Sequence, residues 1–288
     1  MRWAEIEVQT NVTAQEAVEA IMFENGCGGL AIQGETPVFI KCYLPVDDRL
    51  EERISNIQSG ITNLTKFGLD PAPAEITIKY AEEQEWAEAW RQFFRTTRIG
   101  KHIVIKPPWE KFNPEPGDVV IEIEAGMAFG TGQHPTTRMS LEALEKRIRR
   151  CMTVVDFGTG SGILAIAAAK LGACLVIAFD IDELAVRAAR ENVQRNNEEE
   201  HIEVHQTDNL GFIQNTVDLI TANIVAETII KNAPDIARVL RRGGILIASG
   251  IVDEKSADVE RALRNEGFDI AEILKDGEWA TLVAHKAS

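Results

Sequence analysis

The order of apolar and polar positions divides this chain into a short first part and a longer second part. In residues 1–81, alternation of apolar and polar residues predicts strands, and apolar residues three or four apart predict helices. The predicted elements are strand Arg2–Gln9, helix Thr13–Glu24, strands Leu30–Gln33 and Val38–Tyr43, helix Asp47–Phe67 and strand Ile76–Tyr80. This order is that of a ferredoxin-like α+β domain. Thr13 and Glu16 have capping-box spacing, so we expect the first helix to be capped by Thr13.

A polar helix rich in large aromatic residues is predicted next, at residues 82–98. Its aromatic side chains, on neighbouring turns, are Trp86, Trp90, Phe93 and Phe94. Such a stripe is typical of a helix that packs on a core, and it also suits a helix that docks between two domains. Both interpretations place a domain boundary here. We therefore expect a substrate-recognition domain at 1–81, a connector helix at 82–98 and a larger domain at 99–288.

Beyond the connector, strands and helices alternate. Strands are predicted at His102–Lys106 and Val119–Glu124. Seven more follow at Thr153–Asp156, Leu175–Asp180, Ile202–His205, Val217–Ala222, Gly244–Ser249, Asp269–Lys275 and Trp279–His285. Helices lie between most of these strands, and a tight turn joins the last two. The pattern predicts an α/β fold with a doubly wound, mostly parallel sheet in which one strand is reversed.

The first βαβ unit of this sheet has the composition of a nucleoside-binding site. Its first strand runs into a turn that contains Gly158, Gly160 and Gly162, and its second strand ends in Asp180. Glycines let the backbone approach a ligand closely, and a helix N-terminus offers free N–H groups. An acid at the tip of the second strand can accept hydrogen bonds from both ribose hydroxyls. We expect Gly158, Gly160 and Asp180 to contact the ligand; a tight turn without a ligand is the alternative.

The spacing of these glycines indicates which nucleoside is bound. A dinucleotide site has Gly-x-Gly-x-x-Gly, whereas this chain has Gly-x-Gly-x-Gly at 158–162. No Gly-Lys-Ser/Thr follows, which excludes a phosphate-binding P-loop. The spacing thus favours a nucleoside without a pyrophosphate, such as S-adenosylmethionine, over the cofactor of a dehydrogenase.

Two further segments are expected at the same edge of the sheet. Asn223 follows a buried strand, and its amide can accept a hydrogen bond from an amine and donate another. Alternatively, Asn223 only caps the helix near Glu227. Residues 125–137 are rich in glycine and hydroxyl groups, and they suit a lid that closes onto a helix begun at Pro135. Thr137, in the first turn of that helix, can donate to a ligand carboxylate; a plain connector is the alternative.

Composition narrows the choice of partners and compartment. The chain has 30 basic and 45 acidic residues, a net charge of −15, which argues against direct binding of nucleic acid and favours basic partners. No apolar run is long enough to span a membrane or to act as a signal peptide. The cysteines are scattered, so we expect free thiols in a cytoplasmic protein. They are Cys27, Cys42, Cys151 and Cys174. His201 and His205 lie on a predicted strand, and we expect no metal site.

Three segments together resemble one enzyme family. Phe129–Thr137, Asp156–Ile166 and Asn223–Val225 are similar to the ribosomal protein L-eleven methyltransferase family (PrmA), and the likeness extends over the whole chain. The resemblance implies a class I methyltransferase domain and S-adenosylmethionine contacts at Thr137, Gly158, Asp180 and Asn223. Small departures from the family pattern, at Gln133, Thr159 and Val225, remove none of these contacts.

The resemblance also implies an activity, the transfer of methyl groups to the N-terminal amine and lysine side chains of a basic ribosomal protein. Such a reaction requires position more than acid–base chemistry, because a sulfonium methyl group is already electrophilic. Asn223 is the expected catalytic residue. His134 is a candidate proton acceptor, although a role in ordering the lid fits it better. The alternatives are methylation of another protein or of a small amine, and a nucleoside-binding module without turnover.

Overall fold

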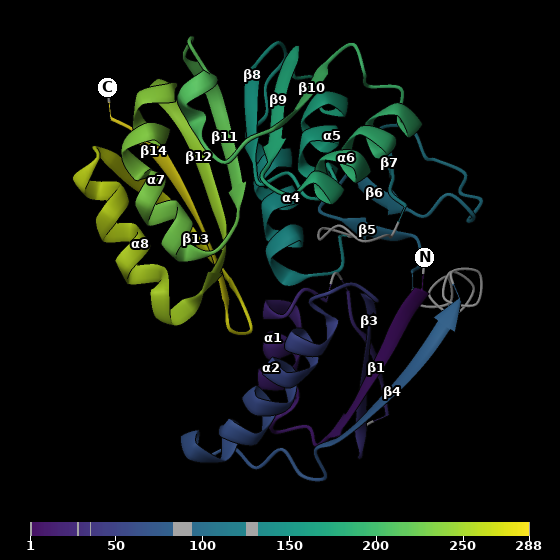
Figure 1. The fold of residues 1–288 in the computed structure, drawn as a ribbon. Helices are drawn as coiled ribbons and strands as arrows, with labels where there is room; N and C mark the ends of the chain where they lie inside the picture. Colours follow the sequence, from purple (N-terminus) through teal and green to yellow (C-terminus); the bar gives the residue numbers. More distant parts are fainter. Residues whose placement is uncertain (1, 28, 35, 83–93, 125–131, 288) are drawn as a thin grey trace. The chain divides into compact units, whose positions relative to one another are not determined.

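A computed structural model describes residues 2–27, 29–34, 36–82, 94–124 and 132–287 (Figure 1). They form two compact units, Met1–Arg95 and Thr96–Ser288. Each unit has its own hydrophobic core. Within the described ranges, no helix has both the length and the apolar character needed to cross a membrane.

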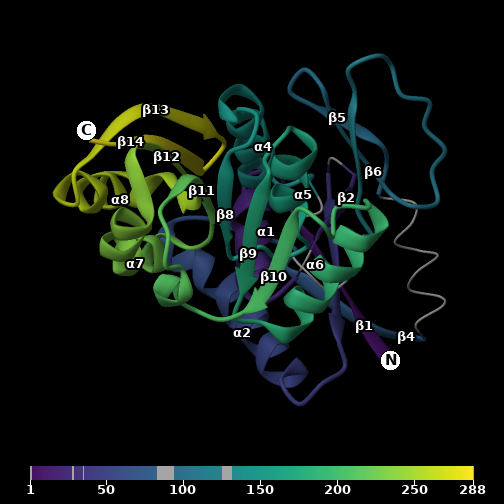
Figure 2. The ribbon, with the colours of Figure 1, turned by 90° about the horizontal axis from the view of Figure 1, so that it is seen from above.

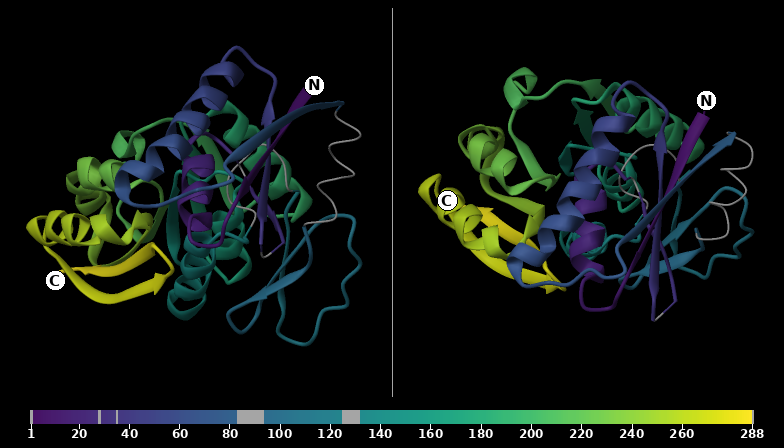
Figure 3. Two further views of the ribbon diagram at one scale, coloured as in Figure 1. Left: turned by 90° about the horizontal axis from the view of Figure 1, so that it is seen from below. Right: turned by 60° about the horizontal axis from the view of Figure 1, so that its bottom comes forward.

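The first unit has the predicted order of elements. It consists of β1 (Arg2–Thr10), α1 (Gln15–Glu24), β2 (Ala31–Gln33), β3 (Val38–Pro45), α2 (Leu50–Asn63) with a 3₁₀ turn η1 (Leu64–Phe67), and β4 (Glu75–Glu82). The sheet order is β2-β3-β1-β4 with antiparallel neighbours, which confirms the ferredoxin-like pattern. Helices α1 and α2 lie on one face of this sheet (Figure 3). Alternate residues of β1 and β3, such as Ile6 and Ile40, are fully buried beneath them.

The predicted capping box of the first helix is wrong. The N-cap of α1 is Ala14, and no side chain caps it. Instead, Asn11 stabilises the turn that precedes the helix, because its Oδ1 accepts a hydrogen bond from the Ala14 N–H at 3.0 Å. An asparagine that satisfies a turn locally competes with a threonine cap two residues later. The second helix is also shorter than predicted, because it begins at Leu50 rather than Asp47.

The second unit contains a small sheet and a large one. The small sheet, in the order β5-β6-β7, comprises β5 (Thr97–Ile99), β6 (Ile103–Lys106) and β7 (Val119–Glu122). The large sheet comprises β8 (Thr153–Phe157), β9 (Leu175–Asp180), β10 (Ile202–Gln206), β11 (Val217–Asn223), β12 (Leu240–Val252), β13 (Phe268–Asp276) and β14 (Trp279–Lys286). Its helices are α4 (Pro135–Arg147), α5 (Ile163–Lys170), α6 (Glu183–Arg195), α7 (Ala226–Val239) and α8 (Asp253–Asn265), and a 3₁₀ turn η2 (Leu210–Phe212) precedes β11.

The large sheet has the predicted doubly wound topology. Its order is β10-β9-β8-β11-β12-β14-β13. Only β14 runs against its neighbours, because β12 and β13 both pair with it in antiparallel fashion. Seen from above, α4, α5 and α6 lie on one side of the sheet and α7 and α8 on the other (Figure 2). Both faces are thereby covered, and the central strands are mostly apolar, as is usual for a parallel sheet.

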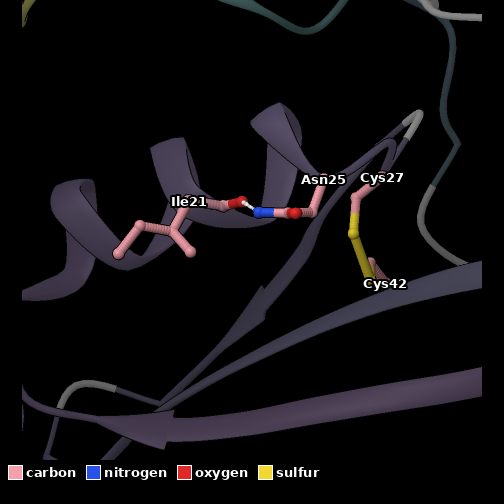
Figure 4. The surroundings of a disulfide bond; sticks show 4 residues. All are labelled: Ile21, Asn25, Cys27 and Cys42. Atoms are coloured by element: carbon pink, nitrogen blue, oxygen red, sulfur yellow. Dashed lines mark hydrogen bonds between the residues drawn. A yellow bond between two sulfur atoms is a disulfide. The ribbon is translucent and has the colours of Figure 1, made fainter. Parts of the chain in front are cut away.

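The expectation of free cysteines is wrong, because all four are paired in disulfides. Cys27, just after α1, is bonded to Cys42 on β3 (Figure 4). Cys151 and Cys174 are bonded to each other. They lie just before β8 and β9, whose first residues pair in register. The fold brings together cysteines that are 15 and 23 positions apart, spacings that carry no signal in the sequence.

Two expected features lie largely outside the described residues. Residues 83–93 include most of the expected connector helix, and residues 125–131 include most of the expected lid. The domain boundaries at 81, 82–98 and 99 and the lid therefore stay predictions. The described ends of the expected connector helix are not helical, because Glu82 belongs to β4 and Thr97 and Arg98 belong to β5. The described end of the lid segment leads directly into α4.

The loop after β11 packs closely against the backbone of β12 at Gly250. The Ile224 N–H donates to the Ser249 carbonyl at 3.1 Å, which brings Ile224 against Gly250. Gly250 has a φ of +78°, and a Cβ there would lie 2.7 to 3.0 Å from the backbone O, N and C of Ile224. Only a residue without a side chain fits this close approach, so Gly250 determines where the chain leaves β11.

Replacing Gly250 with alanine should therefore cost stability for two reasons. The left-handed backbone alone costs roughly 1–2 kcal/mol, and the clash with Ile224 adds to it because backbone atoms cannot move aside. Gly267→Ala is the matched control, since Gly267 has a φ of +80° and a Cβ added there would meet no atom within 4 Å. Denaturant unfolding should show a larger loss for Gly250→Ala than for Gly267→Ala. Equal losses would contradict the close approach.

Helix α4 begins at a half-buried histidine. His134 is its N-cap, and its Nδ1 accepts a hydrogen bond from the Thr136 N–H at 3.3 Å. The His134 ring also packs edge-on against Trp279 of β14, with ring centroids 4.8 Å apart. Burial lowers the pKa of His134 to about 4, although nearby Asp276 acts in the opposite direction. His134 is thus neutral at pH 7 and structures the start of α4.

This shift predicts how stability depends on pH. The unfolded chain takes up a proton on His134 below about pH 6.5, whereas the folded chain does so only near pH 4. Stability should therefore fall as the pH drops through this window, by roughly 2–3 kcal/mol from His134. His134→Asn keeps a capping oxygen and should lessen the fall between pH 6.5 and 4 in denaturant unfolding. The exposed His201→Asn is the control, and an unchanged slope in His134→Asn would contradict the assignment.

Candidate functional site

The candidate site lies where the order of strands in the large sheet reverses. The chain passes from β8 to β9 and β10 on one side and returns through β11 on the other side of β8. Phe157 at the end of β8 therefore pairs with Ala222, next to Asn223 at the end of β11. In open α/β sheets, such a switch point at the carboxyl ends of the strands is where ligands bind.

The glycine turn after β8 is joined directly to the acid at the end of β9. Gly158, Gly160 and Gly162 all have positive φ angles, of 73°, 53° and 83°. The Gly160 N–H donates to Asp180 Oδ2 at 3.0 Å, and the Asp182 N–H donates to Asp180 Oδ1 at 3.1 Å. Each carboxylate oxygen accepts one of these bonds and has a lone pair left for another donor. Asp180 is half-buried, so it can serve both the turn and a ligand.

Across the edge, Asn223 meets Thr137. Asn223 is the last residue of β11, and its Nδ2 donates to Thr137 Oγ1 at 3.3 Å. Thr137 is completely buried in the first turn of α4. The alternative in which Asn223 caps the next helix is wrong, because the N-cap of α7 is Val225 and no side chain caps it.

The carbonyl end of Asn223 marks a place for a ligand. Its Oδ1 is buried and accepts no hydrogen bond from any residue that the structure describes. An acceptor left without a donor in a buried position costs roughly 1–3 kcal/mol. Since the amide nitrogen donates to Thr137, the oxygen is the end of the amide that is left for another partner. A ligand with an N–H donor would satisfy it.

Asp156 is a buried carboxylate beneath the turn, and sequence reasoning assigned it no role. It is fully buried, and it accepts hydrogen bonds from Thr159 Oγ1 at 2.6 Å and Thr221 Oγ1 at 2.7 Å. Burial raises its pKa to about 6, an effect that these hydroxyls and the Ala165 N–H partly offset. Asp156 thereby ties the glycine turn, the start of α5 and β11 together. The only sequence signal was an acid that ends an apolar strand.

Two buried asparagines, Asn192 on α6 and Asn196 at the C-cap of this helix, hold the other side of the turn. The Nδ2 of Asn192 donates to the Ser161 carbonyl at 2.9 Å, and its Oδ1 accepts from the Glu124 N–H at 3.0 Å. Asn196 pairs with both backbone groups of Glu122, at 2.9 and 2.7 Å. The side-chain amides of Asn192 and Asn196 thus bond to the backbone at and just after the end of β7, as a neighbouring strand would. They fix the glycine turn relative to the point where residues 125–131 begin.

The described residues contain no candidate metal site. Among the described residues, no group of three His, Cys, Asp or Glu side chains is arranged to hold a metal ion. His201 and His205 each contact a neighbouring glutamate, Glu198 at 3.2 Å and Glu203 at 3.3 Å.

The arrangement suits binding and positioning rather than acid–base work. At Gly158, a Cβ would lie 2.3 Å from Ile224 Cγ2, so the turn passes close under the loop after β11. A nucleoside whose ribose meets Asp180 would have its other end directed toward Asn223 and Thr137. The residues present thus fit S-adenosylmethionine, a nucleoside that also carries an amine and a carboxylate.

Comparison with known proteins gives the same assignment. The family model described as ribosomal protein L11 methyltransferase (PrmA) matches residues 2–287. Ribosomal protein L11 methyltransferases of Brevibacillus brevis and Bacillus cytotoxicus are each 39% identical to this chain over 312 residues; these matches cover 99% and 100% of the chain and 100% of each relative.

A solved structure extends the match to three dimensions. The crystal structure of the ribosomal protein L11 methylase from Lactobacillus delbrueckii subsp. bulgaricus is 35% identical, with a TM-score of 0.63, and the match covers 68% of this chain and all of that one. Since the family model and the relatives extend over essentially the whole chain, this protein belongs to the ribosomal protein L11 methyltransferase (PrmA) family.

Proposed function

We propose that this enzyme transfers methyl groups from S-adenosylmethionine to ribosomal protein L11, at its N-terminal amine and at lysine side chains. Relatives that are 39% identical to this chain carry the name ribosomal protein L11 methyltransferase. The observation that carries the chemistry is the buried Asn223 Oδ1, an acceptor without a donor among the described residues. An incoming amine is a suitable donor for it.

The cofactor side of the proposed site is formed by four segments. Asp180 would accept hydrogen bonds from the ribose hydroxyls, while Gly158 and Gly160 allow the nucleoside to approach the backbone. Thr137 and Asn223 would hold the amino-acid end. When bound, S-adenosylmethionine supplies an electrophilic methyl group on a positively charged sulfur.

Asn223 is proposed to orient the substrate nitrogen. Because its Nδ2 is engaged with Thr137, only its Oδ1 can face the amine. One N–H of the amine would bond to this oxygen, which turns the nitrogen lone pair toward the methyl group. Such orientation removes much of the entropic barrier of a two-body reaction.

The amine must lose its proton before it reacts, and the described residues near this edge offer no good base for that step. His134 has a pKa of about 4, and Asp156 is enclosed by its own hydrogen-bond donors. The proton is therefore proposed to leave to water. An α-amine has a pKa of about 8 and lysine of about 10.4, so lysine depends more on burial to lower its pKa.

The partners and compartment follow from charge and substrate. A net charge of −15 suits a basic ribosomal protein and disfavours nucleic acid. We place the enzyme in the cytoplasm with its substrate, without membrane attachment. Residues 1–81 are proposed to recognise the protein substrate, and residues 99–288 to bind the cofactor.

Incubation of purified L11 with the enzyme and labelled S-adenosylmethionine tests the reaction. Mass mapping of the product should locate methyl groups on the N-terminal amine and on lysines. Absence of label from L11 despite tight cofactor binding would overturn the L11 assignment.

Asn223→Ala should separate catalysis from cofactor binding. Loss of the orienting acceptor should lower kcat by roughly 100-fold, as loss of a preorganised polar contact does, whereas cofactor affinity should fall only a few-fold. Calorimetry with S-adenosylmethionine and single-turnover methylation measure the two effects. Asn232→Ala, on α7, is the control, because Asn232 only donates to the Thr228 carbonyl one turn away. Equal losses of affinity and rate would make Asn223 a cofactor contact alone.

Removal of residues 1–81 should separate the two domains. A chain that begins at residue 82 should bind S-adenosylmethionine with nearly unchanged affinity, since the large sheet has its own core. It should no longer methylate L11. Full activity of this shortened enzyme toward L11 would contradict the proposed role of the first domain.

A further inference from the structure

A buried chain of hydroxyl groups lies behind the Asn223–Thr137 contact. Ser249 Oγ lies 3.0 Å from the Thr136 carbonyl oxygen and 2.6 Å from Thr281 Oγ1. Ser140 Oγ also bonds to the Thr136 carbonyl, at 2.7 Å. Each of these four residues is 0–1% exposed. They connect α4, β12 and β14 at the edge of the sheet where the candidate site lies.

The direction of these hydrogen bonds is determined by their chemistry. A carbonyl oxygen only accepts, so the single proton of Ser249 Oγ goes to Thr136. The bond between the two hydroxyls must then be donated by Thr281 to Ser249. The chain therefore runs from Thr281 through Ser249 to the Thr136 carbonyl, and removal of either hydroxyl breaks it.

A β-bulge directs Ser249 toward α4. Strand β12 pairs with β14 at Ala248–Leu282 and again at Ile251–Ala280. Ser249 and Gly250 thus stand opposite Thr281 alone. Two residues opposite one is the arrangement of a β-bulge, a feature that is common beside active sites and re-aims a side chain.

Ser249 forms hydrogen bonds to the residue after Asn223 and to the residue before Thr137. Its carbonyl accepts from the N–H of Ile224, which follows Asn223, and its side chain bonds to Thr136, which precedes Thr137. These bonds, of 3.1 and 3.0 Å, are shorter than the 3.3 Å between Asn223 Nδ2 and Thr137 Oγ1.

We propose that Ser249, oriented by Thr281, is a positioning residue that sets the orientation of the Asn223 amide by holding the first turn of α4 against the end of β11. The inference rests on the proposed function, because it assigns Ser249 an effect on methyl transfer through Asn223. In this proposal Ser249 acts through Asn223 and not by contact with the cofactor or the substrate.

The rest of α4 is attached independently, so the fold should survive loss of the hydroxyl. Arg138 pairs with Asp276 at 2.8 Å, and Arg147 pairs with Glu272, both on β13. The effect of Ser249→Ala should therefore be confined to the first turn of the helix.

Kinetics of the full-length enzyme with L11 test the proposal. Ser249→Ala should lower kcat by roughly 10- to 100-fold, as small misplacements do, while KM and cofactor affinity change less than about 3-fold. Thr281→Val should lower kcat in the same way, and Thr281→Ser, which keeps the hydroxyl, should restore it. Asn232→Ala on α7 is again the control, because its side chain donates to a backbone carbonyl, that of Thr228, and takes no part in this chain of hydroxyls. It should keep kcat.

A double mutant distinguishes positioning from general destabilisation. In an Asn223→Ala background, Ser249→Ala should lower kcat little further, because the group through which it acts is gone. Independent, multiplied losses would overturn the proposal, and so would an unchanged kcat in Ser249→Ala alone.

A crystal structure of Ser249→Ala tests the same geometry without any substrate. Displacement of Thr137 Oγ1 from Asn223 Nδ2 supports the proposal, and an unchanged contact overturns it. If the wild-type enzyme failed to methylate L11, the proposed function would fall, whereas this structural comparison would still decide the role of Ser249.

Discussion

The candidate site depends on one hydrogen bond, that between the Asn223 amide nitrogen and Thr137 Oγ1. A carboxamide can turn over and exchange its donor and acceptor ends, and only a fixed partner decides which end faces the substrate. Here the Thr137 hydroxyl accepts from the amide nitrogen, and a buried carbonyl oxygen is left for an incoming N–H. The surrounding framework can be understood as the means of holding this one bond. Gly250 allows the backbone of Ile224 to approach closely, and Gly158 leaves room for the side chain of Ile224.

The electrostatics of the edge agree with a cationic cofactor. Asp180 lies at the rim of the glycine turn and Asp156 beneath it, and their proximity contributes to the raised pKa of Asp156. A positively charged sulfonium near two carboxyl groups would be stabilised, and it would in turn favour the ionised form of Asp156. Neither acid is arranged to take a proton from a substrate. The site can therefore contain two carboxyl groups and still lack a general base among its described residues.

Much of the fold could be predicted from local patterns, and less of the site. Periodicity gave the strands of the four-stranded and seven-stranded sheets because each strand is apolar on the faces it buries, and the predicted switch point located Gly158, Asp180 and Asn223 together. It missed β5 of the small sheet, a strand of three residues at the end of the range expected for the connector helix. The disulfides and the failed Thr13 cap could not be foreseen in this way. Pairing of Cys151 with Cys174 depends on the register of β8 and β9, and α1 begins as it does because Asn11 satisfies the turn first. Such contacts depend on register and on competing local bonds, which composition does not reveal.

The reversed strand gives the last link between the fold and the site. A parallel neighbour of β12 would need a crossover connection, whereas β14 returns from β13 through a tight turn and pairs with β12 in antiparallel fashion. The bulge lies in this antiparallel pairing, where Ser249 and Gly250 share Thr281 as their partner. It gives Gly250 the left-handed backbone that admits Ile224, and it directs Ser249 toward Thr136. The same irregularity therefore acts on both sides of the Asn223–Thr137 bond. A regular ladder through Ser249 and Gly250 would preserve the sheet and lose the alignment of these two side chains.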